Sequence, residues 1–138
     1  MIVLDTNVCI RILRGREEAL AFFSKNRGSL VVPFMAVGEL YYGAERSRDP
    51  ESARIGIDRF LSMLQIVDSN GNIMSAYGKL KAGLAKEGTP VGDADTLIAA
   101  VAKSLGASVA TGNVKHFERF HGLEICNIGL ESYNQFPK

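Results

Sequence analysis

Three acidic side chains stand where carboxylates could hold a metal ion, namely Asp5, Glu39 and Asp95. Asp5 directly follows the apolar run Ile2–Leu4. Glu39 lies among apolar residues about two helical turns after Pro33, and Asp95 lies near the start of a helical segment. Carboxylates that converge within a few Å repel one another unless a proton or a cation lies between them, and hard divalent ions such as Mg²⁺ and Mn²⁺ prefer oxygen ligands. A metal held in this way suits hydrolysis of a phosphodiester bond, because it lowers the pKa of a bound water and neutralises charge on the phosphate.

Each of these acids also has a structural explanation that the sequence leaves open. Aspartate is a preferred N-cap, so Asp5, and likewise Asp93 after Gly92, could do no more than begin a helix. Asp95 would gain about 0.3–1 kcal/mol from the dipole of the helix it helps to open. Glu39 could point to solvent, since glutamate is rarely buried without a partner. Whether the three carboxylates converge therefore cannot be seen in the sequence.

Other catalytic chemistries have weaker support in this chain. His116 and His121 are the only histidines, and we predict His116 to be a surface or partly packed residue. The chain has no GxSxG elbow and no GxxxxGK[ST] loop, which argues against a serine hydrolase and a P-loop protein. Cys9 and Cys126 are too few for a disulfide framework and have no CxxC partner, so we predict two small buried side chains in a reducing compartment.

Short apolar runs alternate along the chain with amphipathic segments. The runs predict strands, because they are short, apolar and end at polar residues. The segments predict helices, because their apolar residues recur at helical spacing; Pro33 suits a first helical position, and Gly88 and Gly106 suit the residue after a helix. The predicted strands are 2–4, 29–32, 65–68, 107–110 and 123–126, and the predicted helices are 6–13, 17–26, 34–45, one from 49–50 onward, 73–86, and one that opens within 92–95 and runs to 105.

This order of elements predicts an α/β fold. Short strands separated by helices are typical of βαβ units, so we expect a three-layer α/β/α sandwich with a central parallel sheet. Such sheets bind ligands at the carboxyl ends of their strands, near the point where the strand order reverses. Asp5 follows the first predicted strand, and Thr111, Gly112 and Asn113 follow the fourth, so we expect these residues at that edge.

The composition sets the class of protein. The 138 residues, with 46% hydrophobic and 22% charged side chains, suit a single domain over 1–138 with one hydrophobic core. The N-terminus lacks a basic region and no apolar stretch approaches the length of a membrane span, so we expect no membrane association and a cytoplasmic location. The net charge of +1 does not indicate a strongly basic surface for binding nucleic acid. If the three acids surround a metal, however, the rest of the chain has 12 acidic residues against 16 Lys and Arg, and is therefore net positive.

Four motifs resemble those of the PIN-domain family, in the order in which that family has them. They are LDTN at 4–7, AVGELYYG at 36–43, VGDADTLIAA at 91–100 and ATGNVKHF at 110–117. Together they span residues 1–123, whereas the segment 128–138 matches no motif. Within the family, the short length and these variants are most similar to the VapC toxins of bacterial toxin–antitoxin pairs.

The resemblance implies an activity and partners. VapC-type proteins are metal-dependent endoribonucleases (hydrolases of RNA phosphodiester bonds, tRNA among them), usually homodimeric and held inactive by a VapB-type antitoxin. Arg11, Arg14 and Arg16 follow the first acid and could contact the RNA backbone, although a solvated helix edge explains them equally well. An antitoxin would lay an amphipathic segment into an apolar groove and direct a basic side chain at the acids. Leu40, Tyr41 and Tyr42 could line that groove, with core packing the better expectation for at least two of them.

The resemblance also assigns roles to individual residues. Asp5, Glu39 and Asp95 become the metal-binding and catalytic acids, with Mg²⁺ or Mn²⁺ as the ion. Asn113 takes a fourth position where many relatives have aspartate, which leaves open whether one metal or two are bound. Asp93 could compensate as an acid acting through water.

Thr6 and Thr111 could orient the carboxylates through their hydroxyl groups.

Two alternative functions are compatible with the same motifs. One alternative is a PIN-type RNA-processing nuclease without an antitoxin, and the other is a non-catalytic PIN scaffold that binds RNA or protein. The three intact acids argue against the scaffold, whereas the sequence does not separate the toxin from the processing nuclease.

Overall fold

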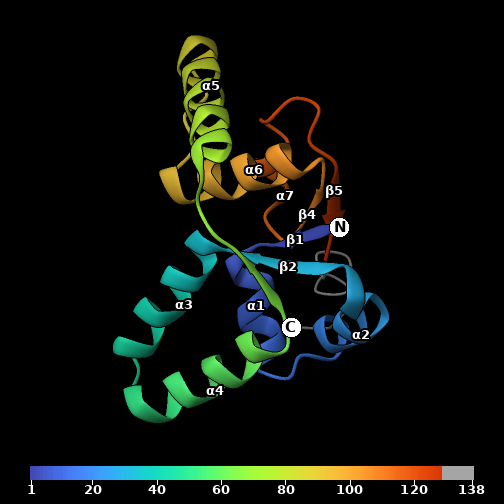
Figure 1. Cartoon of the computed structure of the whole chain (residues 1–138), viewed down its shortest axis with the longest axis vertical. Coiled ribbons are helices and arrows are strands. Elements are labelled where there is room, and N and C mark those ends of the chain that lie inside the picture. The colour runs from blue at the N-terminus through green and yellow to red at the C-terminus, as the bar shows by residue number, and fades with distance from the viewer. Residues whose placement is uncertain (129–138) are drawn as a thin grey trace.

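The computed structural model describes residues 1–128, and in them a five-stranded parallel sheet lies between two layers of helices (Figure 1). The sheet has the order β3-β2-β1-β4-β5, and every neighbouring pair is parallel. Its strands are β1 (Ile2–Leu4), β2 (Leu30–Pro33), β3 (Gln65–Val67), β4 (Ser108–Thr111) and β5 (Ile125–Asn127). The predicted α/β sandwich with a central parallel sheet is therefore confirmed.

The helices divide between the two faces of the sheet in chain order. The first face carries α1 (Thr6–Leu13), α2 (Glu17–Asn26), α3 (Phe34–Glu45) and α4 (Pro50–Ser62), with a short 3₁₀ turn, η1 (Arg27–Ser29), after α2. The second face carries α5 (Gly71–Glu87), α6 (Asp93–Leu105) and α7 (Val114–Phe117). Figure 1 shows the two groups on opposite sides of the strands, with α5 projecting at one end of the molecule.

The sheet separates two hydrophobic clusters, where the sequence predicted one core. Successive residues of a strand point to opposite faces, so β1, β2, β4 and β5 each contribute to both clusters, whereas β3 contributes only Val67. In β1, Leu4 packs with α1–α4 and Val3 with α5–α7, and in β4 Ala110 and Val109 do the same. Because both faces of these strands are buried, polar side chains are accommodated most easily at or beyond the strand ends.

Capping residues mark the starts of α4 and α5 and the end of α6, and α5 begins two residues before its predicted start. The Asp49 carboxylate accepts a hydrogen bond from the Ser52 N–H at 3.1 Å, directly before α4. The Asn70 side chain accepts from the Ile73 N–H at 2.9 Å and begins α5. Gly106 ends α6 in the left-handed conformation with a φ of 63°, which side chains with a Cβ rarely adopt. Each of the two side-chain caps is worth about 0.5–2 kcal/mol to the helix that it begins.

Three sequence predictions require correction. Pro33 is the last residue of β2 rather than the first of a helix, and α3 begins at Phe34. The helix α7 was not predicted, because four residues are too few to show a helical period. Cys9 is buried as predicted, whereas Cys126 is only half-buried; both are free thiols.

Two predictions concern the chain as a whole. No helix in the described residues is both long and apolar enough to cross a membrane. Of the segment 128–138, which matched no motif, residues 129–138 lie outside the described residues, so the single domain over 1–138 stays a prediction.

Candidate active site

The strand order reverses beside β1, and the candidate site lies at that point. The chain passes from β1 outward through β2 and β3, and then returns to place β4 on the other side of β1. The two carboxyl ends meet directly, since the Asp5 N–H donates to the Ala110 carbonyl at 3.0 Å. This is the edge at which parallel α/β sheets bind ligands.

Asp5 lies at this edge and is almost fully buried, with 3% of its surface exposed. It occupies the N-cap position of α1, yet its side chain makes no capping hydrogen bond. Its Oδ2 instead accepts from the Thr111 hydroxyl at 2.7 Å, and Thr111 Oγ1 in turn accepts from the Asn113 N–H at 2.8 Å. The carboxylate is thus held by the end of β4, and a capping role does not explain it.

The surroundings of Asp5 disfavour its charge. The pKa of the carboxyl is raised from 3.8 to about 6, and burial is the largest cause. The hydrogen bond from Thr111 opposes this rise, and the negative charges of Asp95 and Glu39 contribute to it. A cation in the same space would reverse this balance and stabilise the ionised carboxylate.

Glu39 enters the site from α3 and is half-buried. Its Oε1 accepts a hydrogen bond from the Thr6 hydroxyl at 2.5 Å, which joins the second turn of α3 to the first residue of α1. Glu39 therefore faces the interior of the site rather than bulk solvent. Thr6 and Thr111 each bind one acid, as the resemblance suggested for them.

Asp95 lies in the first turn of α6 and contacts a histidine that the sequence reasoning did not select. Its Oδ2 lies 2.8 Å from His116 Nδ1, and the same nitrogen lies 2.7 Å from Asn113 Nδ2. His116 is exposed as predicted, but it also reaches an acid of the site from α7. Its position three residues after Asn113, just beyond β4, is the only signal in the sequence that could have indicated this contact.

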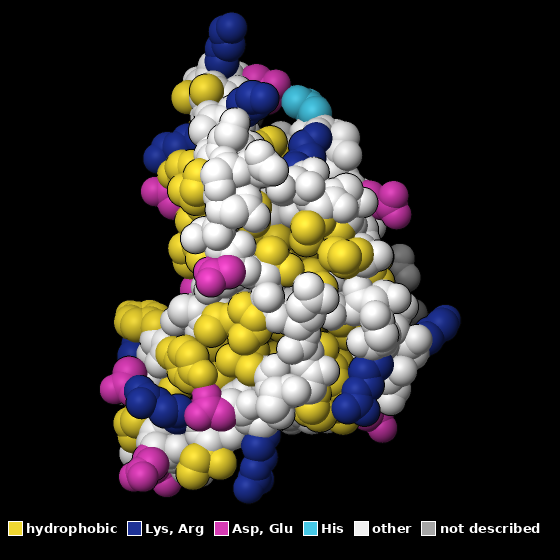
Figure 2. All heavy atoms as spheres, in the orientation of Figure 1, with side chains coloured by type: hydrophobic (Ala, Val, Ile, Leu, Met, Phe, Trp, Pro, Cys, Tyr) yellow, Lys and Arg dark blue, Asp and Glu magenta, His cyan; other side chains and the backbone are white. Residues whose placement is uncertain are grey.

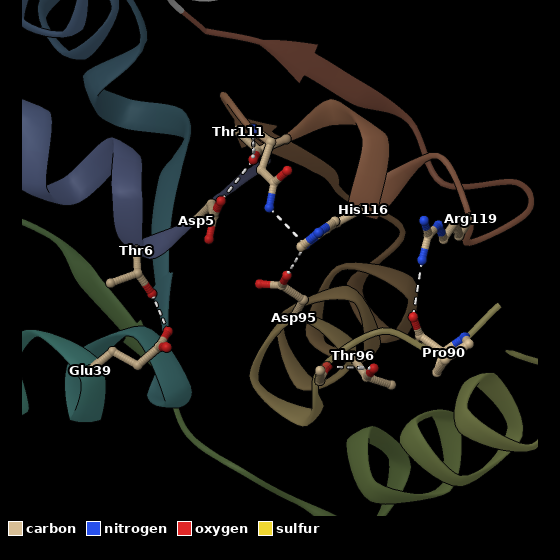
Figure 3. A network of polar contacts seen from close by, with 11 residues as sticks. Asp5, Thr6, Glu39, Pro90, Asp95, Thr96, Thr111, His116 and Arg119 are labelled. Atoms are coloured by element: carbon tan, nitrogen blue, oxygen red, sulfur yellow. Dashed lines mark hydrogen bonds and ion pairs between the residues drawn. The ribbon is translucent and has the colours of Figure 1, made fainter. Parts of the chain in front are cut away.

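The three acids line a single cavity of about 400 Å³. Figure 3 shows their carboxylates turned toward one space, each approached by Thr111, Thr6 or His116. The other lining residues are Asn7, Ile10, Tyr42, Gly43 and Arg46, together with Thr6. Within residues 1–128, no three His, Cys, Asp or Glu side chains are close enough together to hold a metal ion between them. The acids thus surround the cavity without meeting at one point.

This arrangement fits a hard divalent ion that retains water. Magnesium in proteins commonly keeps several waters and is bound through one or two carboxylates together with substrate phosphates. The donors available here are oxygens, from the three carboxylates and from the Asn7 amide and the hydroxyls of Thr6 and Tyr42. The most buried carboxylate, that of Asp5, has its charge disfavoured by its surroundings. Both observations match the needs of Mg²⁺ or Mn²⁺ better than those of a soft metal.

Asp93 does not line the acid cavity, and the N-cap role considered for it is wrong. Its role as an acid acting through water stays a prediction. The N-cap of α6 is Gly92, and Asp93 is the first helical residue. Its exposed carboxylate accepts from the Tyr77 hydroxyl at 2.9 Å and from Lys81 Nζ at 3.0 Å, both on α5. The hydrogen bond from Lys81 is the main reason that the pKa of Asp93 is lowered.

The three arginines at the end of α1 and just after it differ in their surroundings. Arg11 Nη1 donates to the Ile128 carbonyl at 2.9 Å. Its guanidinium lies against Gly112, where a Cβ would come within 3.0 Å of both terminal nitrogens, so a side chain at this position would displace it. Arg14 and Arg16 are exposed and line, with Arg11, a cavity of about 180 Å³. Asn7 and Ile10 line both this cavity and the acid cavity, so the cationic surface adjoins the acids.

Comparison with known proteins agrees with this architecture. The model of the PIN domain family matches residues 2–123, and the chain belongs to this family. It is 40% identical over 126 residues to ribonuclease VapC2 of Haemophilus influenzae, covering 91% of this chain and 96% of that protein. It is 35% identical over 122 residues to the tRNA(fMet)-specific endonuclease VapC of Shigella flexneri, covering 88% and 92%. The crystal structure of DNA-bound VapBC from Salmonella typhimurium aligns with a TM-score of 0.87 and 36% identity, over 91% of this chain and 96% of that one.

Proposed function

We propose that this chain is an endoribonuclease of the VapC type and the toxin of a toxin–antitoxin pair. One observation carries the proposal: Asp5, Glu39 and Asp95 surround a single cavity at the switch point of a PIN-domain sheet. Similarity to VapC ribonucleases extends over nine-tenths of this chain and of its relatives, which supports the same activity here.

The proposed cofactor is Mg²⁺ or Mn²⁺, held directly by Asp5 and Asp95 and by Glu39 either directly or through water. When bound, such an ion supplies an activated water and positive charge against the scissile phosphate. The protein contributes orientation: Thr111 holds Asp5, Thr6 holds Glu39, and His116 holds Asp95. Asn113 adds no charge, and its amide lies against His116, so we assign it to the support of Asp95 rather than to a second metal.

The proposed substrate is structured RNA such as tRNA, which the name of the Shigella relative supports. Arg14 and Arg16 are exposed beside the acid cavity and would contact phosphates of the RNA backbone. Arg11 lies in the same surface, but its hydrogen bond to Ile128 gives it a structural part as well.

A VapB-type antitoxin is the proposed partner, and an apolar groove between α1, α3 and α4 supports it. The groove encloses about 340 Å³, and Figure 2 shows hydrophobic side chains gathered in this region of the molecule. It shares Glu39 and Gly43 with the acid cavity, so a segment bound there could extend a basic side chain to the acids. Leu40 lines the groove as predicted, whereas Tyr41 and Tyr42 do not. The homodimer and the cytoplasmic location implied by the resemblance stay predictions.

Substitution of the acids tests the activity. We expect Asp5→Asn and Asp95→Asn to abolish cleavage of RNA in Mg²⁺ or Mn²⁺ while the far-UV circular dichroism spectrum is unchanged. The matched control is Asp93→Asn, since this aspartate lies on the same helix as Asp95 but outside the cavity, and it should retain activity. Full ribonuclease activity in both site variants would refute the proposal.

The toxin role needs its own test, because an RNA-processing nuclease would share the same site. We expect expression of the chain to arrest growth, and co-expression of a small neighbouring gene for a DNA-binding antitoxin to reverse the arrest. Asp5→Asn should be harmless in the same experiment. Cleavage of RNA in vitro without growth arrest would favour the processing nuclease.

A further inference from the structure

Tyr42 differs from the other tyrosines of the described chain. Tyr41 packs against the cluster under α1–α4 and donates its hydroxyl to Asp58 at 2.5 Å. Tyr77 packs against the opposite cluster and donates to Asp93 at 2.9 Å. Tyr42 belongs to neither cluster, is 64% exposed, and within residues 1–128 its hydroxyl makes no hydrogen bond. The fold therefore gains little from an aromatic ring at this position.

The ring of Tyr42 lies at the rim of the acid cavity beside an arginine. Both Tyr42 and Arg46 line that cavity, and the Arg46 guanidinium carbon lies 5.6 Å from the centre of the Tyr42 ring. In the part of the chain that the structure describes, Arg46 forms no ion pair with a carboxylate. The pair thus presents an open aromatic surface and an available positive charge next to the acids.

Helical spacing aligns these groups with Glu39. Residues 39, 42, 43 and 46 follow the i, i+3, i+4, i+7 pattern and share one face of α3. Glu39 and Arg46 lie about 10 Å apart along the helix axis, with Tyr42 between them. Gly43 has no side chain to fill the space beside Tyr42, and a Cβ there would meet nothing within 4 Å. A strand laid on this face would meet a carboxylate, a ring and a guanidinium in turn.

We propose that Tyr42 stacks on an unpaired base of the RNA next to the scissile phosphate, while Arg46 binds a neighbouring phosphate. The inference rests on the proposed endoribonuclease function. Proteins bind unpaired RNA by stacking its bases on exposed aromatic rings and by pairing its phosphates with cations. The ring lines the acid cavity and not the apolar groove, which favours RNA over a protein segment as its partner.

Fluorescence provides a direct test because the chain contains no tryptophan. Tyr42→Trp introduces a single reporter, and we expect stacking of a base to quench it when single-stranded RNA or tRNA is added in EDTA. Tyr41→Trp is the matched control one residue away, where the ring packs against the protein and quenching should be absent. Equal quenching in the two variants, or none in either, would overturn the inference.

Binding and cleavage then measure the contribution of the ring. We expect Tyr42→Ala to weaken RNA binding in EDTA by about fivefold to about a hundredfold, the range for loss of one stacked base. Tyr42→Phe should recover most of that loss, because stacking needs the ring and not the hydroxyl. Arg46→Gln should make the slope of log affinity against log salt concentration smaller by about 1, as expected for the loss of one phosphate contact.

The outcomes separate this inference from the proposed function. If wild-type protein cleaves RNA and Tyr42→Ala binds and cleaves equally well, the stacking role is wrong and the ribonuclease proposal stands. If Tyr42→Ala keeps its affinity for RNA but loses affinity for the purified antitoxin, the ring serves the protein partner and the inference is overturned. If wild-type protein does not cleave RNA with either metal, the proposed function itself fails.

Discussion

Replacing Asp5 with asparagine should stabilise the metal-free protein at neutral pH, although it should also abolish activity. Burial and the charges of Asp95 and Glu39 raise the pKa of Asp5 from 3.8 to about 6. One pKa unit corresponds to about 1.4 kcal/mol, so ionisation of Asp5 costs the folded protein up to about 3 kcal/mol. Asparagine removes this cost and keeps an oxygen that can accept the hydrogen bond from Thr111.

The effect has a defined pH dependence. Between the unfolded pKa of 3.8 and the folded pKa of about 6, the folded protein retains a proton that the unfolded chain has released. The free energy of unfolding of the wild type therefore falls as the pH rises through this window, whereas Asp5→Asn lacks the titration. The advantage of the variant should be near zero at about pH 4, grow toward about pH 6, and stay constant at higher pH.

Urea unfolding in EDTA, followed by circular dichroism across this pH range, measures the difference. Asp68→Asn is the control, because Asp68 is exposed and lies outside the acid cavity, and its stability should follow the wild type. Added Mg²⁺ should stabilise the wild type more than Asp5→Asn, since the ion binds the ionised carboxylate of the folded state. A variant that is less stable than the wild type at neutral pH in EDTA, or a difference independent of pH, would refute the reasoning.

Three further predictions concern packing and hydrogen bonding. Thr111→Val removes the hydroxyl that donates to Asp5, and should lower the free energy of unfolding by about 1–3 kcal/mol and reduce RNA cleavage, as urea titration and activity assays can measure. Gly78→Ala in α5 places a methyl group where nothing lies within 4 Å, and should stabilise the protein by about 1 kcal/mol, seen as a higher Tm. Cys9 is fully buried, and burial raises its pKa, so iodoacetamide should modify half-buried Cys126 in the native protein and Cys9 only after unfolding, as mass spectrometry can show. An unaffected Thr111→Val would contradict the role of its hydrogen bond to Asp5. A destabilised Gly78→Ala would contradict the open space at Gly78, and rapid modification of Cys9 in the native protein would contradict its burial.

The sequence predicts most of the fold because its local signals agree with the final structure. The strand 2–4 and the helices 6–13, 17–26 and 34–45 have their predicted bounds, since apolar spacing, prolines and glycines all mark the same ends. The order of the strands has no such local signal, because no residue in or near β4 indicates that it pairs with β1, more than a hundred residues earlier. Only the general behaviour of βαβ units made the parallel sheet predictable.

The site was predictable by position but not in its contacts. Asp5 and Thr111 could be assigned to one sheet edge because each follows a predicted strand; in the structure Thr111 is the last residue of β4. Asp93 and Asp95 are two residues apart on α6 and therefore cannot face the same direction, a helical constraint that would have separated their roles. The contact of Asp95 with His116 depends on how a four-residue helix packs beside α6, and short helices leave no periodic signal. The assignment of these residues as metal ligands stays a prediction.

The placement of β4 beside β1 has a consequence for how the protein is made. Asp5 is synthesised 106 residues before Thr111, whose hydroxyl donates a hydrogen bond to it. At ribosomal speeds of about 5–20 residues per second, an interval on the order of ten seconds separates the two. Chains released before Thr111 would carry Asp5 and Glu39 without the strand that completes their cavity, so premature termination should yield harmless fragments. We therefore expect the proposed nuclease to be inactive on the ribosome until β4 has been synthesised.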